Sequence, residues 1–173
     1  VYLGVQFFNA RRLAHNFSLE ELNKVVAFAH LHNVKIFLTM NTLIRNEELP
    51  MWFKTLEQAY LAGIDAVIIQ EISLAHLIKQ FFPGLRVHAS TQASLMNYRG
   101  INLFPDLDLV VLARELTAEE IKIIRQHTKK KLEVFVHGHL CISYSGQCLI
   151  SSLIGKRSGN RGICARSCRK RYN

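Results

Sequence analysis

Residues 34–69, VKIFLTMNTLIRNEELPMWFKTLEQAYLAGIDAVII, contain one full strand–helix–strand unit. The apolar run at 34–39 predicts a buried strand, the amphipathic stretch at 46–62 predicts a helix, and the apolar run at 66–69 predicts the next strand. Strands that alternate with helices usually pair in parallel within an α/β fold. We therefore expect a parallel sheet with helices packed against it.

The same alternation continues along the rest of the chain. The sequences SLEE at 18–21 and TAEE at 117–120 are capping boxes, in which a hydroxyl group and a glutamate exchange hydrogen bonds with backbone amides at a helix start. Asn33, Gly63 and Gly84 occur where helices are expected to end. Strands are predicted at 1–3, 34–39, 66–69, 86–89, 109–112 and 132–136, and helices at 18–32, 46–62, 73–82 and 117–127.

The number of units favours a barrel. VYLG at 1–4 resembles the end of a strand, so we expect the sequence to be a fragment that lacks its first unit. One more strand and helix would bring the count near the eight of a closed (β/α)8 TIM-type barrel, which is our first expectation. An open doubly wound sheet is the second. We expect residues 1–140 to form the barrel core and 141–173 to form a cysteine-rich, basic segment.

Length and charge narrow the class of protein. A chain of 173 residues that is 49% hydrophobic can bury one core, and it has no apolar run long enough for a membrane span. The formal net charge is +9, and residues 156–173 hold seven Lys and Arg with no acid. A local basic patch suits the phosphates of structured RNA, although a solvated tail has the same composition. The predicted phosphate contacts are Arg11, Arg157, Arg161 and Arg169.

The four cysteines are confined to 28 positions near the end of the sequence. Six residues separate Cys141 from Cys148, fifteen separate Cys148 from Cys164, and three separate Cys164 from Cys168. Thiolates select zinc or iron–sulfur clusters, and only the last pair has the spacing of a zinc knuckle. Unequal gaps suit an iron–sulfur cluster better, while zinc or four unliganded thiols are the alternatives. Cysteines at metal-ligand spacing also favour a reducing, cytoplasmic location.

Polar side chains follow almost every predicted strand at its carboxyl end, where barrel enzymes keep their active sites. In the last predicted strand, alternation puts Glu133 and His137 on the opposite face from the apolar residues 132, 134 and 136. The apolar face should meet the helices, so Glu133 and His137 should point into the barrel. The polar side chains after the earlier strands are Asn9, Arg11, Arg12, Asn41, Thr42, Gln70, Glu71, His88, Thr91, Gln92, Arg114 and Glu115.

We predict catalytic roles for four residues at this end: His88 and His137 in proton transfer, Arg114 in binding an anion, and Glu133 in orienting a partner. Structural roles are the alternatives, because His88 could be a hydrogen-bonded core histidine and Arg114 could pair with Glu115. A Cys141 nucleophile activated by His137 or His139 would suit a cysteine peptidase, but that scheme gives the other three cysteines no role.

Long motifs in this sequence resemble the collagenase-like peptidase family thirty-two of the unassigned class. They are EVFVHGHLCISYSGQCLISS at 133–152 and RSGNRGICARSCR at 157–169. Shorter matches occur in the same order as in that family, at VYLG 1–4, NARR 9–12, NFSLEEL 16–22, MNTLI 40–44, HASTQAS 88–94 and VLARELT 111–117. The resemblance therefore covers essentially the whole chain.

The resemblance implies a barrel enzyme with an iron–sulfur cluster, expected to be [4Fe–4S], that hydroxylates a base in transfer or ribosomal RNA. Its ligands would be Cys141, Cys148, Cys164 and either Cys168 or a residue beyond Asn173. The oxygen donor would be a small molecule linked to prephenate. Collagenase-like proteolysis and oxygen-independent quinone hydroxylation are the other activities that the family implies. A non-catalytic RNA-binding module is a further alternative.

Overall fold

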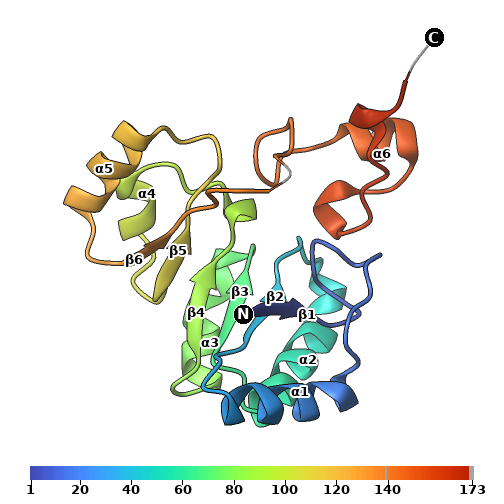
Figure 1. Ribbon diagram of the computed structural model, residues 1–173, viewed down its shortest axis with the longest axis vertical. Helices are drawn as coiled ribbons and strands as arrows, with labels where there is room; N and C mark the ends of the chain where they lie inside the picture. The colour runs from blue at the N-terminus through green and yellow to red at the C-terminus, as the bar shows by residue number, and fades with distance from the viewer. Residues whose placement is uncertain (139, 172–173) are drawn as a thin grey trace.

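The computed structural model of the chain describes residues 1–138 and 140–171. Its centre is a six-stranded parallel sheet (Figure 1). The parallel α/β sheet predicted from the sequence is therefore confirmed. The strands are β1 (Tyr2–Gly4), β2 (Phe37–Met40), β3 (Ala66–Ile69), β4 (Arg86–Ala89), β5 (Leu109–Val111) and β6 (Lys131–Glu133).

The strands lie in the sheet in chain order, and every neighbouring pair is parallel. A doubly wound sheet reverses its strand order at one point, so that alternative is wrong. Right-handed crossovers between successive strands place the helices on one face, as in a barrel wall. In the part of the chain that the structure describes, β1 and β6 are the two edges of the sheet, so closure into an eight-stranded barrel is not shown.

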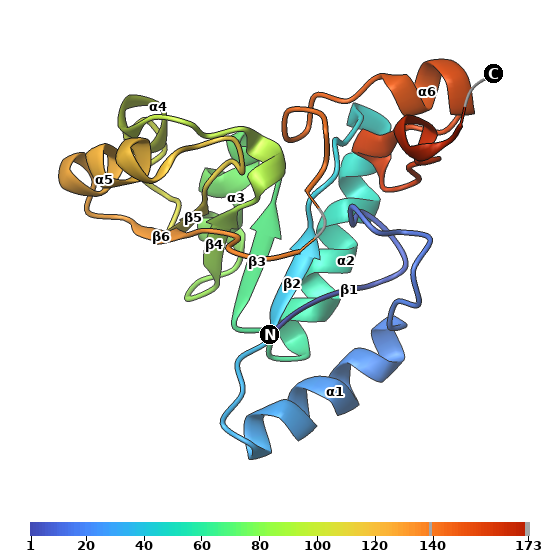
Figure 2. The same ribbon diagram turned by 45° about the horizontal axis from the view of Figure 1, so that its top comes forward.

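Five helices connect the strands and lie beside the sheet (Figures 1 and 2). Both predicted capping boxes are present, at Ser18 and Thr117. Asn33 and Gly63 follow the first two helices with φ of +56° and +87°, the left-handed conformation that ends helices. The helices are α1 (Leu19–Leu31), α2 (Leu49–Leu61), α3 (Ala75–Phe81), α4 (Tyr98–Asn102) and α5 (Ala118–His127).

The hydrophobic core lies between the helices and one face of the sheet. Leu38, Met40 and Val67 alternate with inward-facing residues on β2 and β3, and all three are 0% exposed. Trp52 and Leu56 of α2 are equally buried and belong to the same cluster. Burying one such side chain stabilises the fold by about 1.5–3 kcal/mol. The opposite face of the sheet is left for the polar residues.

The last strand is shorter than the sequence predicts, because β6 ends at Glu133. Val134 and Val136 are 40% and 91% exposed, so the prediction that they meet the helices is wrong. β6 is an edge strand, and no further strand among the described residues pairs with its outer side. Residues 134–136 are therefore outside the strand, although the Phe135 ring packs edge-on against Tyr2 of β1, and the chain crosses toward its last helix (Figure 2).

The cysteine-rich segment, residues 141–173, contains α6 (Ile150–Gly155) and two short 3-10 turns at Gly159–Arg161 and Ser167–Arg169. In Figure 1 it is drawn in orange and red, beyond the ends of β1 and β2. The sequence does not predict α4 or α6, because helices of five and six residues are too short to show a helical period. Within 1–138 and 140–171, no helix is long and apolar enough to cross a membrane.

Candidate functional site

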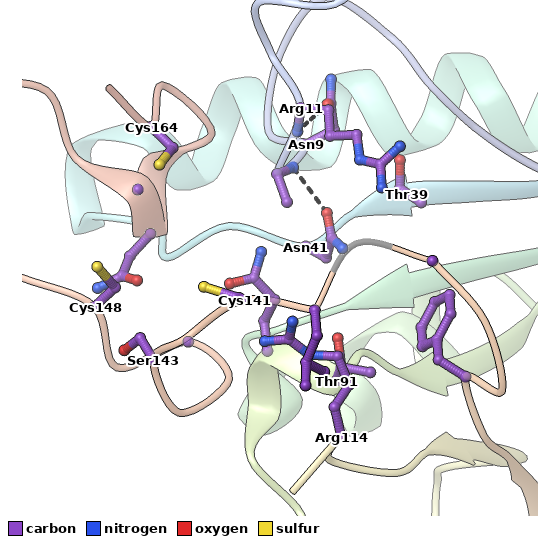
Figure 3. Close-up of a pocket in the computed structure, with 18 of the residues that line it drawn as sticks. Asn9, Arg11, Thr39, Asn41, Thr91, Arg114, Cys141, Ser143, Cys148 and Cys164 are labelled. Atoms are coloured by element: carbon purple, nitrogen blue, oxygen red, sulfur yellow. Dashed lines mark hydrogen bonds between the residues drawn. The ribbon is translucent and has the colours of Figure 1, made fainter. Parts of the chain in front are cut away.

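A cavity of about 890 Å³ lies at the carboxyl ends of the strands (Figure 3). One wall is the cysteine-rich segment, which contributes all four cysteines. The other wall consists of β1, the end of β2 and the loops that follow β1, β2, β4, β5 and β6. We call this space the main cavity. It lies at the end of the sheet where the sequence predicts functional residues.

The four cysteines are free thiols that surround this space. Cys141, Cys164 and Cys168 are exposed, and Cys148 is half-buried. Figure 3 shows Cys141, Cys148 and Cys164 around the same part of the cavity. Over the described ranges, no three His, Cys, Asp or Glu side chains are grouped closely enough to hold one metal ion. The thiols therefore line a volume and do not converge on one point.

Ser145 attaches the first half of the cysteine-rich segment to the loop after β5. The residue is 2% exposed, and its amide donates to Glu115 Oε1 at 2.8 Å. Its hydroxyl oxygen accepts a hydrogen bond from Arg114 Nη2 at 3.1 Å. The next residue, Gly146, has a φ of +73°, and a Cβ there would overlap the carbonyl oxygen of Gln92. These contacts fix the backbone between the first two cysteines.

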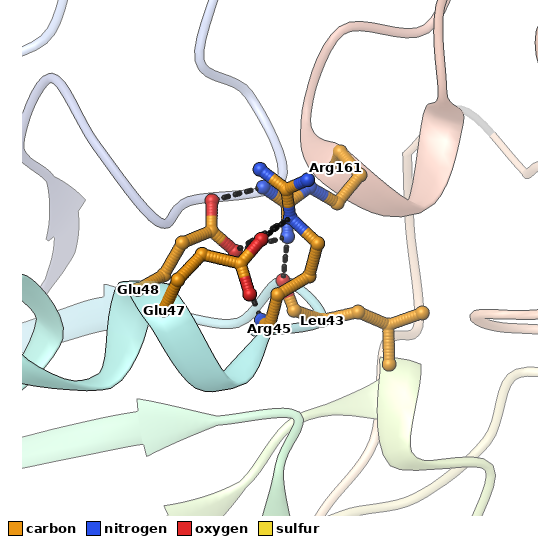
Figure 4. A network of polar contacts seen from close by, with 5 residues as sticks. All are labelled: Leu43, Arg45, Glu47, Glu48 and Arg161. Atoms are coloured by element: carbon orange, nitrogen blue, oxygen red, sulfur yellow. Dashed lines mark hydrogen bonds and ion pairs between the residues drawn. The ribbon is translucent and has the colours of Figure 1, made fainter.

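Arg161 attaches the second half of the segment to the start of α2 (Figure 4). Its guanidinium forms a two-point ion pair with Glu48, in which Nη1 donates to Oε2 at 2.7 Å. The same Nη1 donates to the carbonyl oxygen of Leu43 at 2.7 Å. The hydrogen bonds from Arg161 are the largest cause that lowers the pKa of Glu48 to about 2.

Close backbone packing supports this second half as well. Gly162 has a φ of +77°, and a Cβ there would overlap the carbonyl oxygen of Asn9. The amide of Arg12 donates to the carbonyl oxygen of Gly162 at 3.1 Å. On the other side, the Ser151 hydroxyl of α6 accepts from the amide of Ala165 at 2.8 Å. The backbone around the second cysteine pair is therefore held from both sides.

Asn41 organises the opposite wall by linking three loops. Its Oδ1 accepts from the amide of Ala10 at 3.0 Å, and its Nδ2 donates to the Ser90 hydroxyl at 3.2 Å. The same hydroxyl accepts from the amide of Gln92 at 3.2 Å. The loops after β1, β2 and β4 are thus joined by direct hydrogen bonds.

The charge of the main cavity is positive. Its described lining includes Arg11, Arg114, His15 and His137 and contains no Asp or Glu. Arginines on a lining that contains no acidic residue favour anionic ligands, because a guanidinium binds carboxylate and phosphate oxygens strongly. Of the predicted catalytic residues, Arg114 and His137 line this cavity.

Glu133 lies in a second, smaller cavity of about 50 Å³. Thr39, Asn41 and Phe135 line both cavities, so the smaller one adjoins the floor of the larger. The inward orientation predicted for Glu133 fits this position. Glu133 lines this smaller cavity and is not among the described residues that line the main cavity.

His88 lies deeper, on β4, and is 3% exposed. It is not among the described residues that line either cavity, and its ring packs edge-on against Phe37 with 5.0 Å between centroids. Burial, followed by the nearby Arg86, lowers the pKa of His88 to about 4. The residue is therefore neutral at pH 7. Its position matches the alternative of a core histidine, except that Nδ1 has no hydrogen-bond partner in the described structure.

The four arginines predicted to contact RNA lie in different settings. Arg11, Arg157 and Arg169 are exposed, and Arg169 also donates to the carbonyl oxygen of Leu140 at 3.3 Å. Arg161 is occupied by Glu48, so its guanidinium is not available to a phosphate in this structure. His139, considered above as a base for Cys141, lies outside the described residues.

Two residues that hold the site together, Ser145 and Glu48, were not predicted from the sequence. Ser145 precedes a glycine that must adopt positive φ, and that pairing was a usable indication. Glu48 offered none, because it contacts Arg161 across 113 positions of sequence. A capping glutamate and a long-range ion-pair partner look the same in a sequence.

The model of Peptidase family U32 matches residues 1–173, and the chain belongs to that family. It is 39% identical to "23S rRNA 5-hydroxycytidine C2501 synthase" of Escherichia coli (strain K12), over 99% of this chain and 26% of that protein. It is 37% identical to "tRNA hydroxylation protein P1" of Bacillus subtilis (strain 168), over 100% of this chain and 42% of that protein.

A third relative is "Collagenase" of Porphyromonas gingivalis (strain ATCC BAA-308 / W83), at 32% identity over 99% of this chain and 44% of that protein. The chain thus spans about a quarter to two fifths of the length of these curated relatives. The solved structure of the U32 peptidase Mk0906 superposes with a TM-score of 0.63 and 19% identity, over 77% of this chain and 58% of that one. That likeness supports the fold.

Proposed function

We propose that the protein acts in hydroxylating a base of structured transfer or ribosomal RNA, with an iron–sulfur cluster bound in the main cavity. The main support is that all four cysteines line one cavity at the carboxyl end of a parallel sheet. The names of the ribosomal and transfer RNA relatives support the reaction class. Those proteins are more than twice as long as this chain, so their activity is carried over here as a proposal.

The residues present fit a cluster. Cys141, Cys148, Cys164 and Cys168 are free thiols, and thiolates are the usual ligands of [4Fe–4S] clusters. Their arrangement around a volume suits a [4Fe–4S] cluster, in which each cysteine binds a different iron and the four sulfurs therefore lie further apart than the ligands of one zinc ion. When bound, a cluster would supply electron transfer or an iron site open to substrate. Zinc is the alternative that metal analysis would identify.

Three side chains would serve the substrate. Arg114 uses Nε and Nη2 to bind Ser145, which fixes the orientation of its guanidinium, and Nη1 is left to bind an anion in the cavity. His137 lines the same cavity and would give or accept a proton. Glu133, on the floor, would orient a partner. An acid-free lining suits an anionic oxygen donor of small size.

Exposed arginines around the cavity would bind the RNA backbone. Arg11 belongs to the loop after β1, and Arg157 and Arg169 belong to the cysteine-rich segment on the opposite wall. Phosphate contacts from both walls would place a base between them. Such contacts supply affinity but no sequence information, so they do not identify the base.

Mass spectrometry of RNA nucleosides tests this function directly. We expect deletion of the gene to remove one hydroxylated nucleoside from the RNA. The wild-type protein should restore that nucleoside, whereas the Cys141→Ser and Arg114→Gln variants should not restore it. Arg99→Gln, on α4 and away from the cavity lining, is the matched control and should restore it. An unchanged nucleoside profile would contradict the proposal, and accumulation of an unhydroxylated quinone precursor would then favour quinone hydroxylation.

A peptidase is the competing activity because of the collagenase relative. The geometry gives it less support. A serine peptidase would need an exposed serine in the cavity, but the Ser145 side chain is buried and its hydroxyl is engaged by Arg114 and Glu115. Hydrolysis of denatured collagen by metal-free protein, lost in Cys141→Ser, would establish the peptidase instead.

A further inference from the structure

The Glu48–Arg161 ion pair lies close in sequence to the second cysteine pair. Arg161 precedes Cys164 by three residues. Its side chain leaves the cysteine-rich segment and contacts the start of α2, with 30% of the Arg161 side chain and 19% of the Glu48 side chain exposed. Charge-assisted, two-point contacts of this kind hold both partners in one geometry.

Glu48 is also held by a contact that does not involve Arg161. Its Oε2 accepts from the amide of Arg45 at 2.9 Å, so the carboxylate is fixed on the turn that precedes α2. The helix that follows carries Trp52 and Leu56, both 0% exposed in the core. The ion pair therefore connects the cysteine-rich segment to a helix that is packed into the hydrophobic core (Figure 4).

The adjacent Glu47 makes a contrasting contact. It pairs with Arg45 at 3.1 Å, and both side chains are more than 60% exposed. Exposed pairs of this kind contribute little to stability. Glu47 is therefore a matched control for Glu48: the residue type is the same and the position is adjacent, but its ion pair is with Arg45, and within the described residues no hydrogen bond or ion pair joins it to Arg161.

We infer that Glu48 and Arg161 are positioning residues that set the geometry of Cys164 and Cys168 toward the cofactor. The inference rests on the proposed function, because the geometry of two thiols matters only if they share a ligand. Arg161 then acts within the protein and does not contact RNA. The first pair, Cys141 and Cys148, depends on Ser145 and should be insensitive to this ion pair.

Hydrogen–deuterium exchange on cofactor-free protein is the first test. In Glu48→Gln and Arg161→Gln, amides in 158–168 should exchange about tenfold faster than in the wild type, and amides in 141–148 should not change. Arg161→Lys, which keeps one charged contact, should be intermediate. The double variant should exchange no faster than either single variant, because both remove the same interaction. Glu47→Gln should behave as the wild type.

Visible circular dichroism and electron paramagnetic resonance of anaerobically reconstituted protein are the second test. The spectra of Glu48→Gln and Arg161→Gln should differ from the wild type, while far-ultraviolet circular dichroism is unchanged. Unchanged exchange in 158–168, or equal acceleration in both halves, overturns the inference. If the wild type binds no iron, the proposed function fails, and the exchange experiment still decides whether this ion pair positions the segment.

Discussion

The sheet with its helices and the cysteine-rich segment are held together by different interactions. The sheet depends on an apolar core in which Trp52 and Leu56 are 0% exposed. The cysteine-rich segment leaves large apolar side chains in solvent, including Leu149 at 64% and Leu153 at 79%, and depends on hydrogen bonds and one ion pair. Apolar burial is non-directional, whereas polar contacts need exact geometry and each contributes less.

The two regions also contribute different parts of the candidate site. The sheet region carries the polar wall of the main cavity, whose loops Asn41 joins by hydrogen bonds. The less stable region carries the thiols. A metal that binds only the folded state stabilises it, so cofactor binding should order the cysteine-rich segment far more than the sheet.

The largest effect should come from truncating the core. Trp52→Ala removes a fully buried ring and should lower the free energy of unfolding by about 3–5 kcal/mol, measured by urea denaturation. Leu153→Ala, in the cysteine-rich segment, should change it by less than about 0.5 kcal/mol. An equal loss of unfolding free energy in the two variants would show that the two regions are packed equally well, which would contradict the difference described above.

The second largest effect should be a pH dependence of stability that originates in the sheet. His88 has an ordinary pKa of 6.5 and a folded-state pKa of about 4, so the unfolded chain binds the proton more readily between these values. Stability is therefore full above about pH 6.5 and falls by up to about 3 kcal/mol as the pH drops to 4. His88→Leu should remove this slope in denaturation curves. An unchanged slope would mean that His88 is not buried as a neutral ring.

A smaller pH effect should come from the ion pair between Glu48 and Arg161, which attaches the cysteine-rich segment to α2. Glu48 has an ordinary pKa of 4.5 and a folded value of about 2, so its ion pair stabilises the fold above pH 4.5 and is lost as the pH falls toward 2. We expect about 1–2 kcal/mol, less than the full shift would give, because water screens a pair near the surface. The difference between wild type and Glu48→Gln should shrink over this range. A constant difference would exclude titration of Glu48 as its cause.

The smallest effect should come from a helix cap. Thr117→Ala removes the hydroxyl that accepts from the amide of Glu120 at the start of α5, and should cost about 1 kcal/mol. Because α5 belongs to the sheet region, this variant should bind iron as the wild type does. Loss of iron in Thr117→Ala would show that the two regions are coupled more tightly than their contacts indicate.

The sheet region was largely predictable because its residues follow local rules. Periodicity located the strands and longer helices, and the capping box at Ser18 starts α1 at the expected position. Prediction was poorer at the edge of the sheet, where the apolar residues Val134 and Val136 leave the sheet because they have no neighbouring strand. An apolar pattern shows that a strand is possible, but only tertiary pairing determines where it ends.

The candidate site was predictable in part. The cysteines and Arg114 were found, because thiols at metal-ligand spacing and polar residues after strands are local patterns. Their supports were not, because contacts such as Glu48 with Arg161 join residues far apart in sequence. The basic composition of the segment favoured an RNA contact for Arg161. Only the fold shows that Glu48 lies beside Arg161 and pairs with it.

Iron and acid-labile sulfide analysis after anaerobic reconstitution tests the central claim most directly. We predict about four iron and four sulfide per wild-type chain. Cys141→Ser and Cys164→Ser should lose most of both while keeping the far-ultraviolet circular dichroism of the sheet. A single zinc without sulfide, no metal at all, or full iron content in both cysteine variants would contradict a cluster in the main cavity.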